Sequence, residues 1–311
     1  YFFYVFEAED FIFINSEKKN TCHIDSLNDI NIDVLHSSLG GVITGLTRLQ
    51  KNKRIIFTEG DDDIAYLKAM NEAFKRVNSP SAIDFSKISF WYIRGKDNMN
   101  LKIMANKQLL SQAVQGCKYA VIFDKDYSTE DTNTKFINSD ILRRLGNSSW
   151  AHTHNGYCIE SVLFSEMDKL KKFLNKITGK DEETINTFLD EYFYELKQSL
   201  SNVQSNIYFN MKEKFKSQKK PTRPELDNVE FDIYAREAAQ NIHYAMNKDN
   251  IRAFVLKIEE EWGITLFQRE DDASETFASG LLNKYIDSIE AADDIYNDYV
   301  ILFQKIRDFI V

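Results

Sequence analysis

Carboxylates follow two apolar segments of this chain, at the points where strands would end. Glu59 comes directly after the apolar residues 55–58. Asp124 and Asp126 follow the apolar residues 120–123. In an open α/β sheet the carboxyl ends of parallel strands meet at one edge, where ligands bind. Acids crowded there repel one another unless a divalent cation is present, and their oxygens suit Mg²⁺ or Mn²⁺. The pattern predicts a metal site.

Each acid also has a plainer explanation. Residues 61–63 are all Asp at the start of an expected helix, where acids cap the helix and complement its dipole. Asp is also common in turns, which would account for Asp124 and Asp126. Neither explanation covers Glu59 at a strand end. In an extended segment, residues two apart point to the same side, so Asp124 and Asp126 would address one ion.

Two further residues are assigned to this site. Glu160 would complete the ligand set or hold a second ion, and its alternative is an ordinary helix glutamate. Lys96 follows the expected strand 88–93 at the same edge of the sheet. Its alternative is a solvated loop lysine. A zinc site of His152, His154 and Cys158 is disfavoured because no fourth ligand has motif spacing.

These segments resemble the TOPRIM domain. Residues 55–63, Ile-Ile-Phe-Thr-Glu-Gly-Asp-Asp-Asp, resemble its first motif, and residues 120–126, Ala-Val-Ile-Phe-Asp-Lys-Asp, resemble its second. Residues 95–98 and 157–163 are similar to segments of the OLD-like (overcoming lysogenization defect) nucleases, in particular the TOPRIM effectors of PARIS-type phage-defence systems encoded with ABC-type ATPases. The resemblance covers about residues 55–163. It departs from many TOPRIM proteins at residues 127–129, where Tyr-Ser-Thr replaces an early glycine.

The resemblance implies a metal-dependent endonuclease that hydrolyses DNA or RNA, tRNA included, under the control of an ABC-type ATPase. It implies two Mg²⁺ or Mn²⁺ ions held by Glu59, Asp63, Asp124, Asp126 and Glu160. Catalysis would fall to Glu59, Asp124, Asp126 and Lys96, and substrate binding to Lys96, Lys125, Lys169 and Lys172. The alternatives are primase- or topoisomerase-type chemistry, or a catalytically silent module that docks on an ATPase and dimerises through aromatic-rich helices at residues 192–193 and 285–309.

The order of expected elements predicts an α/β fold, a mostly parallel TOPRIM-like sheet flanked by helices, followed by a helical domain. We expect a lead-in at residues 1–53, which would be the end of an ATPase domain, a catalytic domain at 54–165 and a helical domain at 166–311. Strands are expected at 1–6, 10–15, 21–24, 55–58, 88–93, 119–123 and 150–154. Helices are expected at 27–50, 61–77, 101–115, 159–164, 167–177, 182–201, 230–246, 250–262 and 278–311, with a polar loop at 124–134 and a basic connection at 212–224.

Composition limits the class of protein. The 311 residues are 43% hydrophobic and carry a net charge of −9, which argues against a simple DNA-coating protein. Three widely spaced cysteines suit a reducing cytoplasm, and no apolar segment approaches the roughly 20 residues of a membrane span. The chain has no P-loop, so we expect no ATP site of its own. Because it opens on Tyr1, we expect a fragment, and a homodimer or larger assembly is the expected state.

Overall fold

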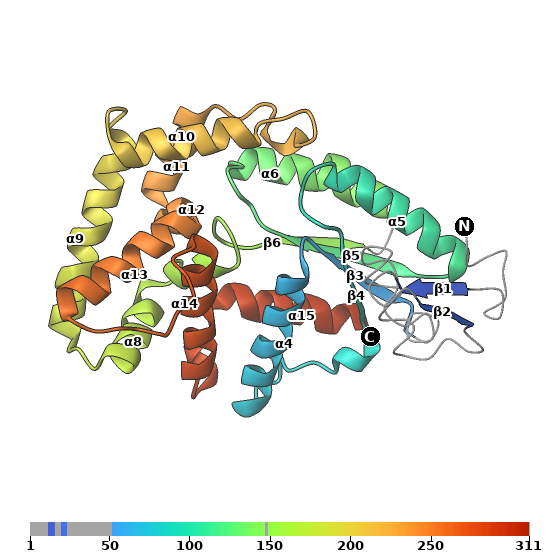
Figure 1. The fold of residues 1–311 in the computed structure, drawn as a ribbon, viewed down its shortest axis with the longest axis horizontal. Helices are drawn as coiled ribbons and strands as arrows, with labels where there is room; N and C mark the ends of the chain where they lie inside the picture. The colour runs from blue at the N-terminus through green and yellow to red at the C-terminus, as the bar shows by residue number, and fades with distance from the viewer. Residues whose placement is uncertain (1–11, 16–19, 24–51, 147–148, 311) are drawn as a thin grey trace.

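The computed structural model describes residues 12–15, 20–23, 52–146 and 149–310, and its centre is a parallel sheet (Figure 1). The four strands lie in the order β4-β3-β5-β6 and all pairs are parallel. The predicted α/β class is confirmed. The two central strands are those that precede the predicted acids. The strand bounds are β3 Arg54–Thr58, β4 Ser89–Tyr92, β5 Lys118–Phe123 and β6 Trp150–Thr153.

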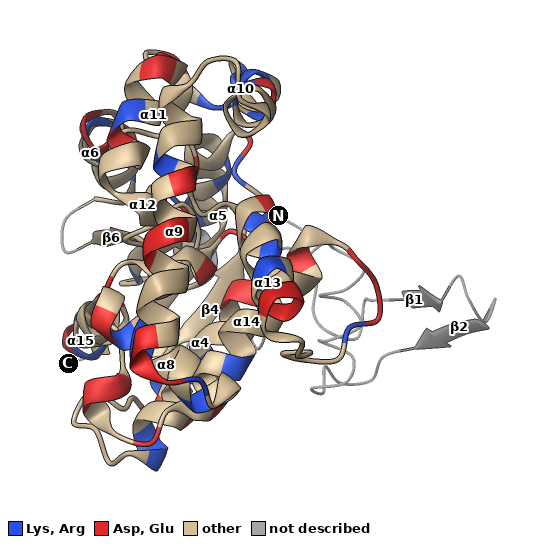
Figure 2. Cartoon of the chain, turned by 90° about the vertical axis from the view of Figure 1, so that its left-hand side faces the viewer, with Lys and Arg blue, Asp and Glu red and all other residues tan. Residues whose placement is uncertain are grey.

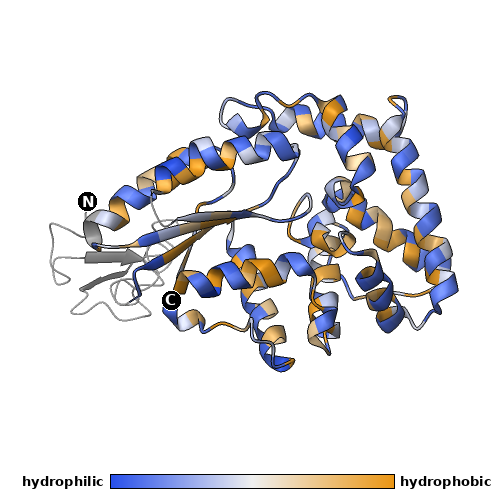
Figure 3. Ribbon diagram, turned by 180° about the vertical axis from the view of Figure 1, so that it is seen from behind, coloured by the Kyte–Doolittle hydropathy of each residue, from blue (hydrophilic) through white to orange (hydrophobic). Residues whose placement is uncertain are grey.

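The central strands are apolar because helices cover both faces of the sheet. On one face, Ile55, Phe57 and Val121 pack with residues of α5 (Met99–Ala113) and of the segment that follows α6 (Glu130–Phe136). On the other face, Ile56 and Ile122 belong to the core that includes α4 (Asp61–Arg76) and α15 (Asn297–Ile310). Figure 3 shows apolar residues on the strands and on the helices beside them.

The chain after β6 is mainly helical, and its last helix, α15, lies beside the sheet (Figure 1). Arg54 Nε donates a hydrogen bond to the Phe309 carbonyl oxygen at 2.7 Å, and the rings of Trp150 and Phe309 meet edge to face. One hydrophobic core therefore runs from the sheet into the helical region. The helices are α8 Met167–Thr178, α9 Glu182–Ser201, α10 Asn206–Gln218, α11 Phe231–Gln240, α12 Ile242–Ala245, α13 Lys248–Trp262 and α14 Ser274–Ser288.

Short helical turns connect these elements. The segment after α6 is a π-helix, Ile137–Leu142, that continues into α7, Arg143–Leu145. Sequence patterning did not indicate these two elements. The 3₁₀ turns are Phe85–Lys87, Pro224–Leu226 and two that bear on the sites below, η4 Glu160–Phe164 and η6 Ala292–Asp294.

Four predicted connections and helices are wrong, among them the helix 230–246, which is interrupted at Asn241 between α11 and α12. The polar loop 124–134 contains the start of α6, where the Thr129 hydroxyl accepts from the Thr132 amide and caps the helix. The basic connection 212–224 contains most of α10, whose buried Met211 and Phe215 lie four residues apart. The helix 278–311 is interrupted between α14 and α15, because Asp294 Oδ2 accepts from the amides of residues 290 and 291 and forms a turn.

Near the start of the chain, β1 Ile12–Asn15 pairs with β2 Asn20–His23 in an antiparallel hairpin. The sequence predicts strands at residues 10–15 and 21–24 but not their pairing. The expected strand 1–6 and the expected helices at 27–50 lie outside the described residues. Within the part of the chain that the structure describes, no helix has both the length and the apolar character needed to cross a membrane.

Candidate metal centre

Hydrogen bonds join the segments that follow β3, β4 and β5 at the predicted edge of the sheet. Glu59 follows β3, and its Oε1 accepts from the Asp124 amide after β5 at 2.8 Å. The Glu59 carbonyl oxygen accepts from the amide of Gly95, which follows β4, at 2.9 Å. Gly95 has φ +76°, a left-handed conformation that glycine adopts without strain. The parallel register thus places the first two predicted acids side by side.

Asp63 lies in the first turn of α4. Its Oδ2 accepts from the Gly60 amide at 3.0 Å, so it caps the helix as the plainer explanation proposed. Capping and a role in the site are compatible, because the same carboxylate lies on the cleft that Glu59 borders.

Glu160 approaches from the turn after β6. Asp124 Oδ1 accepts from the neighbouring Ile159 amide at 3.1 Å, which fixes this turn to β5. The turn is tight: a Cβ added at Gly156 would lie 2.2 Å from Ser161 Oγ, so glycine is needed there. The Glu160 side chain is 3% exposed, and its Oε2 has no hydrogen bond among the described residues. A buried carboxylate oxygen without a donor is costly unless a cation meets it.

A cleft of about 440 Å³ brings these acids together. Its walls include four of the five predicted metal ligands, namely Glu59, Asp63, Asp124 and Glu160. The helical region supplies the opposite wall through Lys248 at the start of α13 and Glu275, Thr276 and Ser279 of α14. Lys248 Nζ lies 4.0 Å from Glu160 Oε1. Sequence patterning did not indicate these residues, since each sits among ordinary polar helix positions.

Asp126 is the fifth predicted ligand and is placed differently. The prediction that it extends β5 and points with Asp124 is wrong, because β5 ends at Phe123 and Asp126 has φ +53°. Its Oδ2 accepts from Lys96 Nζ at 3.1 Å and from Arg223 at 2.6 Å. Lys96 also donates to the Asp124 carbonyl oxygen. Asp126 borders a neighbouring cleft of about 260 Å³ that shares Asp124 and Lys248 with the first.

Lys96 and Arg223 are therefore buried partners of a carboxylate. Lys96 is 4% exposed and Arg223 7%, which excludes the solvated-loop alternative for Lys96. Arg223 also donates to Glu225 Oε1 at 2.5 Å. Breaking such a pair on one side leaves a buried charge unpaired, which is strongly destabilising. These two cations hold the turn after β5 in place.

Burial and mutual repulsion change the pKa values in the cleft. Burial, followed by the charges of Asp126 and Asp63, raises the pKa of Glu59 to about 7, although Lys96 opposes the change. Burial and then Glu59, Asp63, Asp126 and Glu160 raise the pKa of Asp124 well above its ordinary value. Burial also raises the pKa of Asp63. Asp126 behaves oppositely: burial favours its neutral form, but Lys96 and Arg223 outweigh this and lower its pKa.

The carboxylate oxygens of the cleft suit a hard divalent cation, but the distances between them limit how many can bind the same ion. Among the described residues, the one group of three or more with all ligand atoms within 4.8 Å is His152, His154 and Asp298, not the cleft acids. Three cleft carboxylates therefore do not stand ready around one ion. Mg²⁺ commonly keeps several waters and uses one or two carboxylates, which this cleft offers.

The predicted substrate lysines lie elsewhere. Lys125 is buried, pairs with Glu130 at 2.6 Å and lies 3.5 Å from the centre of the Tyr244 ring. Lys169 donates to the Ile295 carbonyl oxygen at 2.6 Å, and Lys172 pairs with Asp294. None of the three borders either acid cleft, and their substrate role stays a prediction. Lys214 and Lys248 border the clefts instead.

The chain matches no known protein family, no curated protein and no solved structure. The likeness to TOPRIM nucleases thus stands on the motifs at residues 55–63, 95–98, 120–126 and 157–163.

Proposed function

We propose that this protein is a metal-dependent nuclease that hydrolyses phosphodiester bonds of DNA or RNA. The observation that supports this most is the meeting of four acids from separate elements on one cleft. The raised pKa values of Glu59 and Asp124 reflect burial first and then the crowding of negative charge there. Crowded carboxylates at the edge of a parallel sheet are a typical arrangement for divalent ions.

Glu59, Asp63, Asp124 and Glu160 would hold Mg²⁺ or Mn²⁺, and Glu160 Oε2 is a donor with no competing hydrogen bond among the described residues. Such an ion, when bound, activates water and neutralises charge on the phosphate. Asp126 would contribute through the turn that it fixes, because its Oδ2 is already held by Lys96 and Arg223.

The basic residues at the clefts divide into two groups. Lys96 is buried and bonded to Asp126 and the Asp124 carbonyl oxygen, so it positions the acids rather than reaching a substrate. Lys248 and Lys214 border the open clefts and would attract phosphate. Figure 2 shows both signs of charge mixed on the same helices, for example on α8 and α13, so local lysines would guide a nucleic acid to this acidic chain.

Regulation by an ABC-type ATPase and assembly into dimers are part of the same proposal and follow from the resemblance alone. The silent docking module has less support. Of the aromatic residues that suggested it, Phe193, Tyr285 and Phe309 are buried in the core, and Tyr192 is half-buried and donates to the Asn250 carbonyl oxygen.

Two conservative substitutions test the proposal. Glu59→Gln and Asp124→Asn remove a charge at nearly constant volume, and we expect each to lower cleavage at least about 100-fold. Single- and double-stranded DNA, RNA and tRNA would be incubated with Mg²⁺ or Mn²⁺. Asp61→Asn is the matched control, because Asp61 is an exposed acid in the first turn of α4, two residues after Glu59, and does not border the cleft.

Folding can be checked independently in these variants. Neutralising a crowded buried carboxylate relieves repulsion, so the melting temperature should hold or rise. Cleavage by Glu59→Gln and Asp124→Asn at the rate of the unmodified chain would disprove the nuclease assignment.

A further inference from the structure

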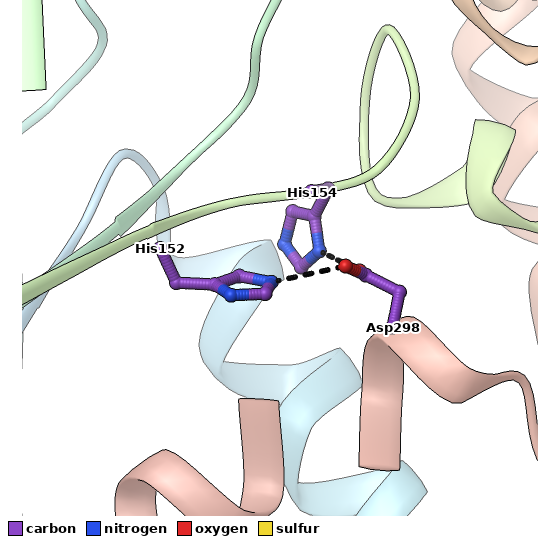
Figure 4. A group of neighbouring side chains, drawn as sticks. All are labelled: His152, His154 and Asp298. Atoms are coloured by element: carbon purple, nitrogen blue, oxygen red, sulfur yellow. Dashed lines mark hydrogen bonds and ion pairs between the residues drawn. The ribbon is translucent and has the colours of Figure 1, made fainter. Parts of the chain in front are cut away.

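A second cluster of ligand-type side chains shares no residue with the two acid clefts and lies between the sheet and the last helix. His152 belongs to β6, His154 follows it, and Asp298 lies in the first turn of α15 (Figure 4). Asp298 is 144 residues beyond His154 in the chain. The three side chains are buried, at 4%, 2% and 9% exposure. The sequence analysis disfavoured a zinc site of the two histidines with Cys158, and the structure brings the histidines to Asp298 instead.

The distances fit a tetrahedral metal site. His152 Nε2 lies 3.4 Å from Asp298 Oδ1, and His154 Nδ1 lies 3.2 Å from Asp298 Oδ2. All three ligand atoms lie within 4.8 Å of one another. Zinc–nitrogen and zinc–oxygen bonds of about 2.0–2.2 Å in a tetrahedron separate adjacent ligand atoms by about 3.4 Å. The two measured distances are close to this value but run to different oxygens of Asp298, and the other separations are at most 4.8 Å, so the side chains would draw together modestly around one ion.

The contacts with Asp298 differ between the two histidines. Two neutral imidazoles that both donate to one carboxylate would be the metal-free explanation of this cluster. His154 Nδ1 is hydrogen-bonded to Asp298, as that explanation requires. His152 Nε2 lies 3.4 Å from Oδ1, within ion-pair distance, but it is buried and does not meet hydrogen-bond geometry with any described residue. A metal ion between the three side chains would use the lone pair of this poorly bonded nitrogen.

We propose that His152, His154 and Asp298 bind one divalent transition metal ion, with Zn²⁺ the best fit. Two imidazoles and one carboxylate suit zinc and its neighbours in the first transition series rather than Mg²⁺, which prefers oxygen. His152 Nε2, His154 Nδ1 and an Asp298 oxygen are the protein ligands, and the fourth tetrahedral position takes water or another small ligand. This site is distinct from the all-oxygen acid cleft.

The ion would link β6 to the start of α15. That link fastens the last helix to the edge of the sheet, beside the turn that carries Glu160. Binding to the folded chain alone stabilises it by mass action, so added metal should raise the melting temperature of metal-free protein. Demonstrating this metal binding does not require cleavage activity.

Cobalt binding offers a direct test. The full chain carrying both Glu59→Gln and Asp124→Asn, which weaken the acid cleft, would be stripped with a chelator and titrated with Co²⁺. We expect the intense visible absorption of tetrahedral Co²⁺, one ion per chain, and its loss when Zn²⁺ is added in competition. His152→Gln and Asp298→Asn should each abolish the absorption. His243→Gln is the control, since His243 lies outside the cluster, and should keep it.

Absence of bound Co²⁺ in the cleft variant, or an unchanged spectrum in both His152→Gln and Asp298→Asn, would overturn the proposal. Should these two variants fold poorly, X-ray absorption on the Zn²⁺-loaded unmodified chain decides. Two imidazole nitrogens around the ion support the site, and a shell of oxygens alone refutes it. Because the readouts are spectroscopic, they can fail or succeed independently of the proposed nuclease activity.

Discussion

At the residue scale, Lys248 brings a positive charge to a cleft that is otherwise rich in acids. Burial favours its neutral form, but Glu160, Cys158 and Asp124 outweigh this and raise the pKa of Lys248, so the side chain is charged at neutral pH. A cation at this position competes with a metal ion for the carboxylates. It would also neutralise a substrate phosphate. Removing this charge would therefore strengthen metal binding and weaken substrate binding, so measuring both tells the two effects apart.

We predict that Lys248→Gln tightens Mn²⁺ binding about 5-fold, because it removes a repulsive charge worth about 1 kcal/mol at the screened cleft. The same change should weaken nucleic-acid cleavage about 10-fold or more. Calorimetric titration with Mn²⁺ and cleavage kinetics measure the two effects. Lys257→Gln, at an exposed position of the same helix, is the control and should alter neither. Weaker Mn²⁺ binding in Lys248→Gln would contradict this account.

His243 makes part of the stability depend on pH. Burial, and then the charge of Lys125, lowers the pKa of His243 from 6.5 to about 4. The unfolded chain therefore binds a proton at this residue more readily than the folded chain does. The contribution of neutral His243 to the free energy of unfolding is fully present above pH 6.5 and is lost progressively as the pH falls from 6.5 towards 4.

The free energy of unfolding of the unmodified chain falls between pH 7 and pH 4.5. We predict that this fall is about 1–2 kcal/mol smaller in His243→Gln. At about 1.4 kcal/mol per pH unit the upper limit is about 3 kcal/mol, and the partial exposure of the ring lowers it. Urea unfolding of both proteins across this pH range gives the difference. Glu59 and Asp124, whose pKa values are raised, act in the opposite direction in both proteins and cancel in the comparison. Parallel pH profiles would refute the role of His243.

The residues that sequence patterning could predict are those tied to strand ends. Glu59 and Asp124 follow apolar runs, and the parallel register then forces them together. Arg223 and Lys248 carry no comparable signal, because their positions depend on how distant helices fold back on the sheet. Asp126 shows a further limit, since its left-handed φ and its two buried cations were not readable from an Asp-x-Asp spacing.

At the element scale, α15 holds the helical region against the sheet. Phe303 is fully buried and its ring lies 4.5 Å from that of Phe74 in α4 and 6.0 Å from Phe85, centre to centre. The packing of this helix therefore depends on a large apolar side chain in the middle of its buried face. Strand and helix positions were predictable from periodicity, but the return of α15 to the sheet was not, because periodicity does not tell which surface a helix covers.

We predict that Phe303→Ala lowers the free energy of unfolding by about 3–5 kcal/mol, the cost of lost burial plus a cavity. Urea denaturation followed by circular dichroism measures the change. Ile301→Ala, at a position that is 40% exposed on the same helix, should cost less than about 1 kcal/mol. Equal effects of the two substitutions would show that α15 does not pack on the sheet as described.

At the scale of the whole molecule, one continuous hydrophobic core extends across the domain boundary expected between residues 165 and 166. Ile56 and Ile122 of the sheet, Phe164 of the connecting turn and Phe254 of α13 belong to one cluster of buried residues. The cleft is likewise built from both sides, with Glu59 from the sheet and Lys248 from the helices. Removing the helical region would therefore expose one face of the sheet and remove a cleft wall, so the proposed activity should be tested on the intact chain.

Continuity of the core predicts that sheet and helices unfold together. Trp91 is buried in the sheet and Trp262 packs on Phe188 in the helical region, with ring centres 5.0 Å apart. Two proteins, each keeping one of these tryptophans and carrying Phe at the other two positions, would be unfolded in urea. In each, we expect the fluorescence midpoint to coincide with the midpoint from circular dichroism, because a shared core gives a single cooperative transition. In each protein the difference between the fluorescence midpoint and the circular dichroism midpoint would be measured. If this difference were not the same for Trp262 as for Trp91, the regions before and after residue 165 would be independent folding units.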